Sequence, residues 1–354
     1  MTNSVSSFLT SAPNDTNVEN DSVVSNDFST TLGALILGLV FLVGVPGNVF
    51  IVWSILARTR RRSVTTLLIL NLAFADGSLM AITVFFIVYL AKQSWVFGDV
   101  MCKGLFYLCN TNMYASIFLI VLMSVHRFVA VVLPRRTSSL ITMKVVRRVI
   151  VGTWVLVMVI SIPSLVFRDV REDHDENNKT RHVCAPNHTL PRHVRFQYAF
   201  ETVAGFILPY AVIITCYVLI LRRLRQTKFR RKVRSENLIL AIVVTFGLFW
   251  LPYHVINMMQ VRQVLLLTLD HITQSSRVVT SALAFISSCA NPILYTFAGK
   301  SYIKQSGFAF MARLFEGTSL DQAATKKGKD AVGLTTVDST SGSGPGIHIT
   351  PNGS

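Results

Sequence analysis

Polar side chains that could bind a cation occur inside long apolar stretches of this sequence. Asp76 lies in the middle of one stretch, Asn48 and Asn291 lie within two others, and Ser116 and Ser287 occur at comparable depth. An ionisable residue inside an apolar span is costly and usually functional. A carboxylate among hydroxyls and amides suits a small hard metal ion such as Na⁺, with Asp76 as the charged ligand. A purely structural polar cluster is the alternative.

Seven apolar stretches must position these groups. They cover residues 32–57, 65–91, 103–133, 146–167, 197–221, 237–260 and 277–299. Each is long enough for a helix across a bilayer, which takes about 20 residues, and helices satisfy the backbone polar groups internally. The chain is 51% hydrophobic and only 15% charged, which excludes an ordinary soluble protein. The sequence therefore predicts an all-α membrane protein, a seven-transmembrane helix bundle.

Basic residues are distributed unequally among the connecting segments. Residues 1–30 contain no Lys or Arg, whereas most of the 34 Lys and Arg residues follow the first, third, fifth and seventh stretches. Because basic loops stay in the cytoplasm, we expect a multi-pass plasma-membrane protein with an extracellular N-terminus and a cytoplasmic C-terminus. The net charge of +16 then reflects contact with anionic membrane lipids rather than nucleic-acid binding.

The predicted outer side carries two kinds of covalent site. Four sequons there are candidate glycosylation sites: Asn14, Asn20, Asn178 and Asn187. Cys102 begins the third stretch, and Cys184 lies in the long loop after the fourth. Both face an oxidising compartment, so they can form a disulfide that holds this loop over the bundle.

The C-terminal part has two compositions. Residues 300–317 place aromatic and leucine side chains among basic ones, which predicts a short amphipathic eighth helix along the membrane. Residues 318–354 are rich in Ser, Thr, Gly and Lys, and we expect them to be disordered. The predicted organisation is an extracellular glycosylated N-terminus (1–30), the seven-helix domain (31–299), the eighth helix (300–317) and a cytoplasmic tail (318–354).

Short motifs occur in a fixed order along the stretches. They are 44–48 (GVPGN), 71–76 (NLAFAD), Cys102 with Cys184, Trp154, Pro209 with Tyr217, 246–252 (FGLFWLP) and 291–295 (NPILY). In this order and at these depths they resemble the rhodopsin-like, class A G-protein-coupled receptors over about residues 30–317. Within that family, the stretches 52–56 (VWSIL), 249–257 (FWLPYHVIN) and 314–318 (LFEGT) are similar to the leukotriene B4 receptor group, the first, high-affinity type more than the second.

The resemblance implies a receptor in which an agonist shifts the helix bundle to an active state. Its ligand would be leukotriene B4 or a related anionic lipid, and its partner a heterotrimeric G protein of the inhibitory class in chemoattractant and inflammatory signalling. Arrestin and receptor kinases would bind the tail. The implied ligand contacts are Phe106, Asn110, Tyr114, Arg168, Glu201, Tyr253, His254, Asn257 and Arg277.

The resemblance also implies an internal switch without a cofactor. Asp76, Ser116, Ser287 and Asn291 would hold Na⁺ as an allosteric ion. Phe246 and Trp250 would relay ligand contacts to the helix kink at Pro252. The residues that would rearrange around the G-protein site are Arg127, Tyr217 and Tyr295.

The residue types themselves favour an anionic ligand. Arg168 and Arg277 stand at the outer mouth of the bundle, and a guanidinium binds a carboxylate through paired hydrogen bonds. Apolar walls are expected from Phe86, Leu105, Phe106, Phe200, Met258 and Phe285. A mostly apolar cavity with few polar groups suits a small amphipathic molecule.

One position departs from the family pattern. His126 stands where an acidic residue usually precedes the arginine, here Arg127. A carboxylate would pair with the guanidinium, whereas a neutral imidazole can only hydrogen-bond and a protonated one would repel it. We therefore expect a weakly restrained inactive state with some agonist-free signalling.

Other function classes fit less well. Transporters usually contain internal repeats, and none is detectable here. Asp76 and Glu201 are the only acidic residues within the seven stretches, too few for the charged ring of a channel. No catalytic set of an intramembrane enzyme occurs. Among receptors, a peptide chemoattractant or a different hydroxy fatty acid remains an alternative ligand, because outer acids such as Glu172 and Asp173 could bind a basic peptide.

Overall fold

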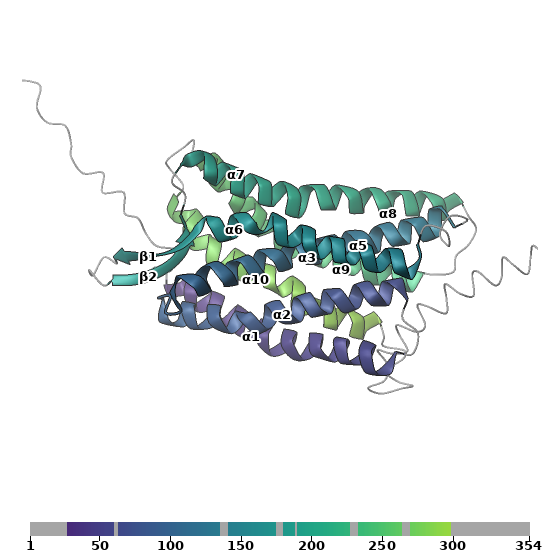
Figure 1. Ribbon diagram of the computed structural model, residues 1–354, viewed down its shortest axis with the longest axis horizontal. Coiled ribbons are helices and arrows are strands. Elements are labelled where there is room, and N and C mark those ends of the chain that lie inside the picture. The colour runs from purple at the N-terminus through teal and green to yellow at the C-terminus, as the bar shows by residue number, and fades with distance from the viewer. Residues whose placement is uncertain are drawn as a thin grey trace, which may run out of the picture.

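The computed structural model describes residues 27–59, 63–134, 141–174, 180–187, 190–226, 233–263 and 270–298. Seven helical segments within these ranges are long and apolar enough to cross a membrane. They lie side by side in an elongated bundle, with a two-stranded hairpin at one end (Figure 1). The prediction of a seven-helix membrane bundle is confirmed. We call the two ends of the bundle the hairpin end and the opposite end.

Three long helices come first. They are α1 (Asp27–Trp53), continued by the π-helical turn η1 (Ser54–Arg58), then α2 (Val64–Lys92) and α3 (Gly98–Val132). The α2 helix begins where the Ser63 hydroxyl accepts a hydrogen bond from the Thr66 amide at 3.1 Å, because a side-chain oxygen satisfies an otherwise free N–H of the first turn. It ends at Gln93, whose left-handed φ of 49° stops the helix.

The next two spanning segments are interrupted. The fourth consists of α5 (Met143–Ile160) and α6 (Ile162–Val166), and the fifth of α7 (Pro191–Thr202), the π-helical turn η2 (Val203–Ile207) and α8 (Leu208–Gln226). Pro163 lies in the first turn of α6, where the missing N–H costs no helical hydrogen bond. The last two segments are α9 (Val233–Gln263) and α10 (Asp270–Ala298), which contain Pro252 and Pro292.

The hairpin consists of β1 (Arg168–His174) and β2 (Thr180–Pro186), paired antiparallel with Val170 opposite Cys184. From the sequence, only a loop was expected here. A disulfide between Cys102 and Cys184 joins β2 to the first turns of α3, which confirms the predicted pairing. The Trp95 amide also donates to the His182 carbonyl at 2.7 Å, so the hairpin is fixed from the α2–α3 connection as well.

A salt-bridge cluster fixes the other strand of the hairpin. Lys103 on α3 lies 2.6 Å from Asp169 of β1 and 2.9 Å from Asp99. The Asn187 side chain donates to Asp169 at 3.0 Å. The hydrogen bonds from Lys103 and Asn187 hold the pKa of the Asp169 carboxyl below its usual value. The hairpin is thus positioned over the bundle by covalent and ionic contacts to one helix, α3.

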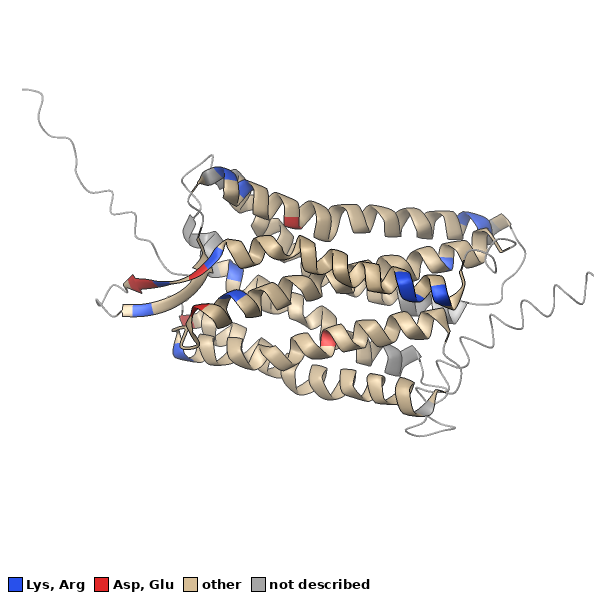
Figure 2. Cartoon of the chain, in the orientation of Figure 1, with Lys and Arg blue, Asp and Glu red and all other residues tan. Residues whose placement is uncertain are grey.

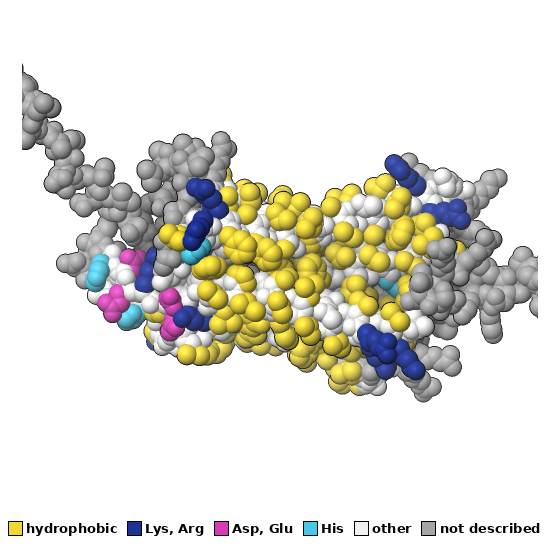
Figure 3. Space-filling model, turned by 45° about the horizontal axis from the view of Figure 1, so that its top comes forward, with side chains coloured by type: hydrophobic (Ala, Val, Ile, Leu, Met, Phe, Trp, Pro, Cys, Tyr) yellow, Lys and Arg dark blue, Asp and Glu magenta, His cyan; other side chains and the backbone are white. Residues whose placement is uncertain are grey.

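Apolar side chains occupy both the interior and the outer surface of the bundle. Ile51, Leu72, Ile117 and Ile120 belong to a buried core that joins α1, α2 and α3. Many other large apolar side chains are exposed, and Figure 3 shows them over the middle of the bundle with charged groups toward the ends. A soluble protein rarely exposes such an area, so this surface is the one that contacts lipid.

Charges differ between the two ends. Lys and Arg occur at both ends, whereas the coloured Asp and Glu residues lie at the hairpin end and within the bundle (Figure 2). The charged side chains that Figure 2 colours at the opposite end are therefore all basic.

Candidate functional site

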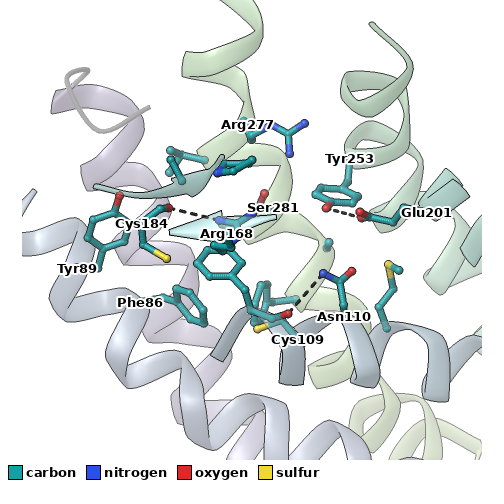
Figure 4. A pocket seen from close by; sticks show the side chains of 18 of the residues that line it. Phe86, Tyr89, Cys109, Asn110, Arg168, Cys184, Glu201, Tyr253, Arg277 and Ser281 are labelled. Carbon is teal, nitrogen blue, oxygen red and sulfur yellow. Dashed lines mark hydrogen bonds between the residues drawn. The ribbon is translucent and has the colours of Figure 1, made fainter. Parts of the chain in front are cut away.

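A cavity lies beneath the hairpin and between the helices (Figure 4). It contains about 1150 Å³ of empty space, including a part open to solvent. Most of its lining is apolar, with Phe86, Met113, Trp250 and Phe285 among the largest side chains. The polar groups that line it include Asn110, Arg168, Gln197, Glu201, Tyr253 and Arg277. This composition is typical of a site for a small amphipathic ligand.

Arg168 enters the cavity from the start of β1. Its guanidinium carbon lies 3.5 Å from the centroid of the Phe106 ring, and Nη1 donates one long bond of 3.4 Å to the Cys184 carbonyl. Its Nε is buried without a hydrogen-bond partner, and no described carboxylate forms an ion pair with it. Burial lowers the pKa of Arg168, as expected for a cation that has lost water without gaining an acid.

Arg277 has quite different surroundings. Its Nη2 donates to Asn257 Oδ1 at 3.0 Å and also to Gln260 Oε1. Asn257 in turn donates to Glu201 Oε1 at 3.4 Å, and the Tyr253 hydroxyl donates to the same oxygen at 2.6 Å. This chain of hydrogen bonds connects α7, α9 and α10, and Figure 4 shows its Tyr253–Glu201 contact on one side of the cavity. Arg277 therefore already shares a network with an acidic group of the protein.

Three predicted ligand contacts lie behind the cavity wall. Tyr114 is buried against Phe118, with ring centroids 6.3 Å apart. The His254 ring lies 3.3 Å, Nδ1 to Oγ1, from Thr202. Asn257 is fully buried in the Arg277 network. None of these three lines the cavity, so their predicted direct contact with a ligand is not supported in this conformation.

A second polar group lies deeper, around Asp76 of α2. Asp76 is 0% exposed and accepts hydrogen bonds from Ser116 at 3.1 Å and from Asn291 at 2.7 Å. Asn48 donates to the Ser288 carbonyl at 3.3 Å, and its Oδ1 is buried without a partner among the described residues. The structure thus joins residues from α1, α2, α3 and α10, as the sequence analysis expected.

Trp250 connects the cavity to α10. It lines the cavity, and its indole N–H donates to the Ser287 hydroxyl at 2.9 Å. Phe246, one turn along α9, stacks on Trp250 with ring centroids 5.5 Å apart. A displacement of Trp250 would therefore reach both α10 and the segment of α9 that precedes Pro252.

The predicted coupling residues lie toward the opposite end. Arg127 and His126 are both buried near the end of α3, and His126 Nδ1 has no hydrogen-bond partner within the described ranges. Tyr217 is half-buried on α8. Tyr295 belongs to α10, but its side chain lies outside the described part. The expected agonist-free signalling stays a prediction. The variant His126→Asp tests it, because an acid at this position should pair with Arg127 and lower the signalling measured without agonist.

Residues 47–295 match the model of the seven-transmembrane receptors of the rhodopsin family. The chain belongs to this family. It is 38% identical to leukotriene B4 receptor 1 of Homo sapiens over 308 residues, which cover 85% of this chain and 86% of that receptor. Leukotriene B4 receptor 2 of Homo sapiens is 35% identical over 310 residues, 84% of each chain. The C3a anaphylatoxin chemotactic receptor of Oncorhynchus mykiss is 32% identical over 298 residues, 80% of this chain and 78% of the relative.

These relatives are receptors rather than enzymes. Together with the seven spanning helices, they indicate that this chain is a multi-pass protein of the plasma membrane. The higher identity to the first leukotriene B4 receptor than to the second agrees with the resemblance inferred from the motifs.

Several cavity residues follow the sequence prediction, and others do not. Phe106, Asn110, Arg168, Glu201, Tyr253 and Arg277 line the cavity, as do the predicted apolar walls Phe86 and Phe285. The walls expected from Leu105, Phe200 and Met258 do not line it. Met258 is 42% exposed, because it lies on the outer face of α9, where it contacts lipid.

Sequence reasoning missed part of the lining. Leu37, Tyr89, Gln197, Tyr198 and Ser281 also line the cavity. The Tyr198 ring centroid lies 4.7 Å from the guanidinium carbon of Arg277. Its position three residues before Glu201, on the same helical face, was a usable signal. Leu37 carries no such signal, because an apolar residue on α1 can equally face lipid.

The modification sites are described only in part. Asn187 is exposed just after β2, and the nitrogen that would carry a glycan is the one that donates to Asp169. Asn14, Asn20, Asn178, the predicted eighth helix and the tail lie outside the described residues.

Proposed function

We propose that this receptor binds leukotriene B4, or a closely related hydroxy fatty acid anion, with Arg168 holding the carboxylate. The observation that carries the proposal is the state of Arg168: a cation inside an apolar cavity with one long hydrogen bond and an unpartnered Nε. A carboxylate supplies two acceptors in the geometry that a guanidinium prefers. It would also replace the water that burial has removed.

Arg277 is a weaker candidate for the carboxylate. Its hydrogen bonds to Asn257 and Gln260 are made within the protein, and Glu201 lies one link away. A second anion there would compete with an acid already present. Hydroxyl groups of the ligand have other partners at the cavity surface, including Asn110, Gln197 and Ser281.

Signalling follows from the position of Trp250. A ligand that fills the cavity contacts Trp250 and changes its stacking with Phe246 and its bond to Ser287. An agonist shifts the equilibrium only by its preference for the active arrangement. We propose that the active state binds an inhibitory-class G protein at the opposite end, near Arg127 and Tyr217. Arrestin and receptor kinases are proposed partners of the tail.

The Asp76 group fits an allosteric Na⁺. The unpartnered Oδ1 of Asn48 and the carboxylate of Asp76 are oxygen ligands of the kind that a hard cation takes. Ser116, Ser287 and Asn291 would complete the site. A bound cation would add charge compensation beneath Trp250 and favour the arrangement in which these groups converge.

We propose an orientation with the hairpin end outside the cell. The Cys102–Cys184 disulfide forms in an oxidising compartment, and the predominantly basic opposite end suits the cytoplasmic face. The cavity is then accessible to an extracellular ligand.

The test compares two neutral variants of the arginines, Arg168→Gln and Arg277→Gln. In cells that express the receptor, we expect Arg168→Gln to weaken suppression of cyclic AMP by leukotriene B4 by about ten- to hundred-fold, the equivalent of one charged hydrogen-bonded contact. Arg277→Gln should weaken it less. Surface expression is measured for both. Equal potency of wild type and Arg168→Gln would contradict the carboxylate assignment, and silence of the wild type would contradict the ligand.

A peptide chemoattractant is the second candidate, favoured by the similarity to the C3a receptor. Two of the acids at the hairpin end are less available for a basic peptide, because Asp99 and Asp169 both pair with Lys103. If leukotriene B4 gives no response and a basic chemoattractant peptide does, this candidate replaces the first.

A further inference from the structure

The cavity lining is divided by polarity. On one side of Arg168, Glu201 and Tyr253 face the space from α7 and α9, whereas Phe86 and Tyr89 of α2 lie on the other side (Figure 4). The second side is completed by small and aliphatic side chains of α1, α2 and α10: Leu37, Leu90, Val278 and Ala282. Tyr89 and Ser281 are the polar exceptions. We call this region, between α1, α2 and α10, the apolar arm.

Gly33 of α1 lies directly behind the apolar arm. A Cβ atom built at position 33 would lie 2.8 Å from Cγ1 of Val278 and 3.1 Å from Cδ1 of Leu90. The first of these contacts is shorter than packed carbon atoms tolerate, so a side chain must move. Both neighbours line the cavity. If their side chains move away from α1, they move into the cavity. The missing side chain at position 33 therefore keeps the apolar arm open.

Resting on the proposed function, we propose that the apolar arm holds the hydrocarbon end of the anionic lipid and that Gly33 sets the length of chain it admits. Arg168 fixes the carboxylate near the middle of the cavity, so the chain must extend to one side. The α7–α9 side already contains the hydrogen-bonded pair Glu201 and Tyr253, which an alkyl chain would desolvate without replacing their bond. In the apolar arm the polar side chains are Tyr89 and Ser281, which carry no charge, so this cost is smaller.

The arm should make potency depend on chain length. Burying one further methylene improves affinity by about four-fold, for as long as the methylene lies inside the arm. Leukotriene B4 shortened stepwise from its methyl end should therefore lose about four-fold per carbon at the wild-type receptor. Gly33→Ala should weaken the full-length ligand by about ten-fold and the shortest active analogue by less than about three-fold, because only a long chain reaches the displaced side chains.

The chain offers a matched control and a rescue. Gly38 lies on the same helix, and a Cβ at that position would meet nothing within 4 Å, so Gly38→Ala should leave every potency unchanged. The double variant Gly33→Ala/Val278→Ala removes the clashing methyl group and should recover most of the full-length potency. Cyclic-AMP dose–responses with the length series, with surface expression measured for each variant, provide the readout.

The possible outcomes separate this inference from the function on which it rests. Loss confined to the long ligands, with rescue by Val278→Ala, supports the inference. A Gly33→Ala effect that is equal for all chain lengths, or one matched by Gly38→Ala, overturns it while the ligand assignment stands. A wild type that responds to no member of the series overturns both.

Discussion

Two acids are buried between the described helices, and they differ in what compensates their charge. Asp76 is 0% exposed and Glu201 is 4% exposed. The hydrogen-bond partners of Asp76 are neutral: the hydroxyls of Ser116 and Ser288 and the Asn291 amide. Glu201 accepts from Tyr253 and Asn257, and Asn257 is bonded to Arg277. One acid is therefore suited to a cation from solution, whereas the other belongs to a network that contains a cation of the protein.

This difference assigns separate roles to two similar residues. A buried charge with neutral partners can be regulated by an ion that binds and leaves. A buried charge within an arginine network instead braces the elements that supply it, here α7, α9 and α10. It also explains why Arg277 and Arg168 are not equivalent. Nε is unpartnered in both, but the hydrogen bonds of Arg277 lead through Asn257 to an acid, whereas Arg168 makes one long bond to a backbone carbonyl.

The largest effect is expected when the brace loses its acid. Glu201→Gln leaves Arg277 without its acidic counterpart and should cost about 2 kcal/mol, as the loss of a buried charged hydrogen-bond partner does. The thermal midpoint of the purified receptor should fall by about 5 °C. The double variant Glu201→Gln/Arg277→Gln should recover part of this loss, because residues in one network do not act additively. If the losses of the two single variants simply add in the double variant, Glu201 and Arg277 do not share one network, and the contrast with Asp76 is contradicted.

A smaller effect is expected at the other acid. In wild-type membranes, replacing choline with Na⁺ should weaken agonist potency by about five- to ten-fold, within the usual range of allosteric coupling. Asp76→Asn should abolish this dependence, because the amide carries no charge for the ion. Glu201→Gln is the matched control and should keep the sodium response. Equal sodium dependence in wild type and Asp76→Asn would show that Asp76 is only a structural polar residue.

The smallest effect is expected for an exposed acid. Asp169 pairs with Lys103 at the surface, where salt bridges contribute little to stability. Lys103→Gln should therefore lower the thermal midpoint only slightly, and less at high salt. The pKa of the Asp169 carboxyl is lowered in the folded protein. The stability that this carboxylate contributes is therefore fully present above the ordinary carboxyl pKa and is lost as the pH falls through the lowered pKa. Lys92→Gln, outside this cluster, is the control. A loss as large as that of Glu201→Gln would contradict the contrast between buried and exposed acids.

Much of the fold could be predicted from the sequence. The stretch 65–91 corresponds to α2 (Val64–Lys92), and 103–133 corresponds closely to α3 (Gly98–Val132). Long apolar stretches determine such helices because a bilayer leaves no other way to satisfy the backbone. The Cys102–Cys184 disulfide was also predictable, since both cysteines lie on the same predicted side. The β1–β2 hairpin was not, because its polar residues show no strand pattern.

The cavity was less predictable than the fold. Arg168 and Arg277 had the same status in the sequence, as two arginines at one end of the bundle. Tyr114, His254 and Asn257 were expected at the ligand surface but lie behind it. Leu37 and Gly33 had no functional signal. Whether such a residue faces the cavity, another helix or lipid depends on the rotation of its helix about the helix axis. The sequence does not reveal this rotation, because every face of a membrane helix is apolar enough to contact either lipid or protein.

The sequence by itself determined the seven spans, the disulfide and the chemistry available at each depth, because these depend on residue type and on distance along one helix. The tertiary structure decided which charged groups are partners. The Asn257–Glu201 contact joins residues 56 positions apart, and the Asn291–Asp76 contact joins residues 215 positions apart. Such pairings depend on how neighbouring helices pack, and packing determines which arginine joins the network of an acid and which does not.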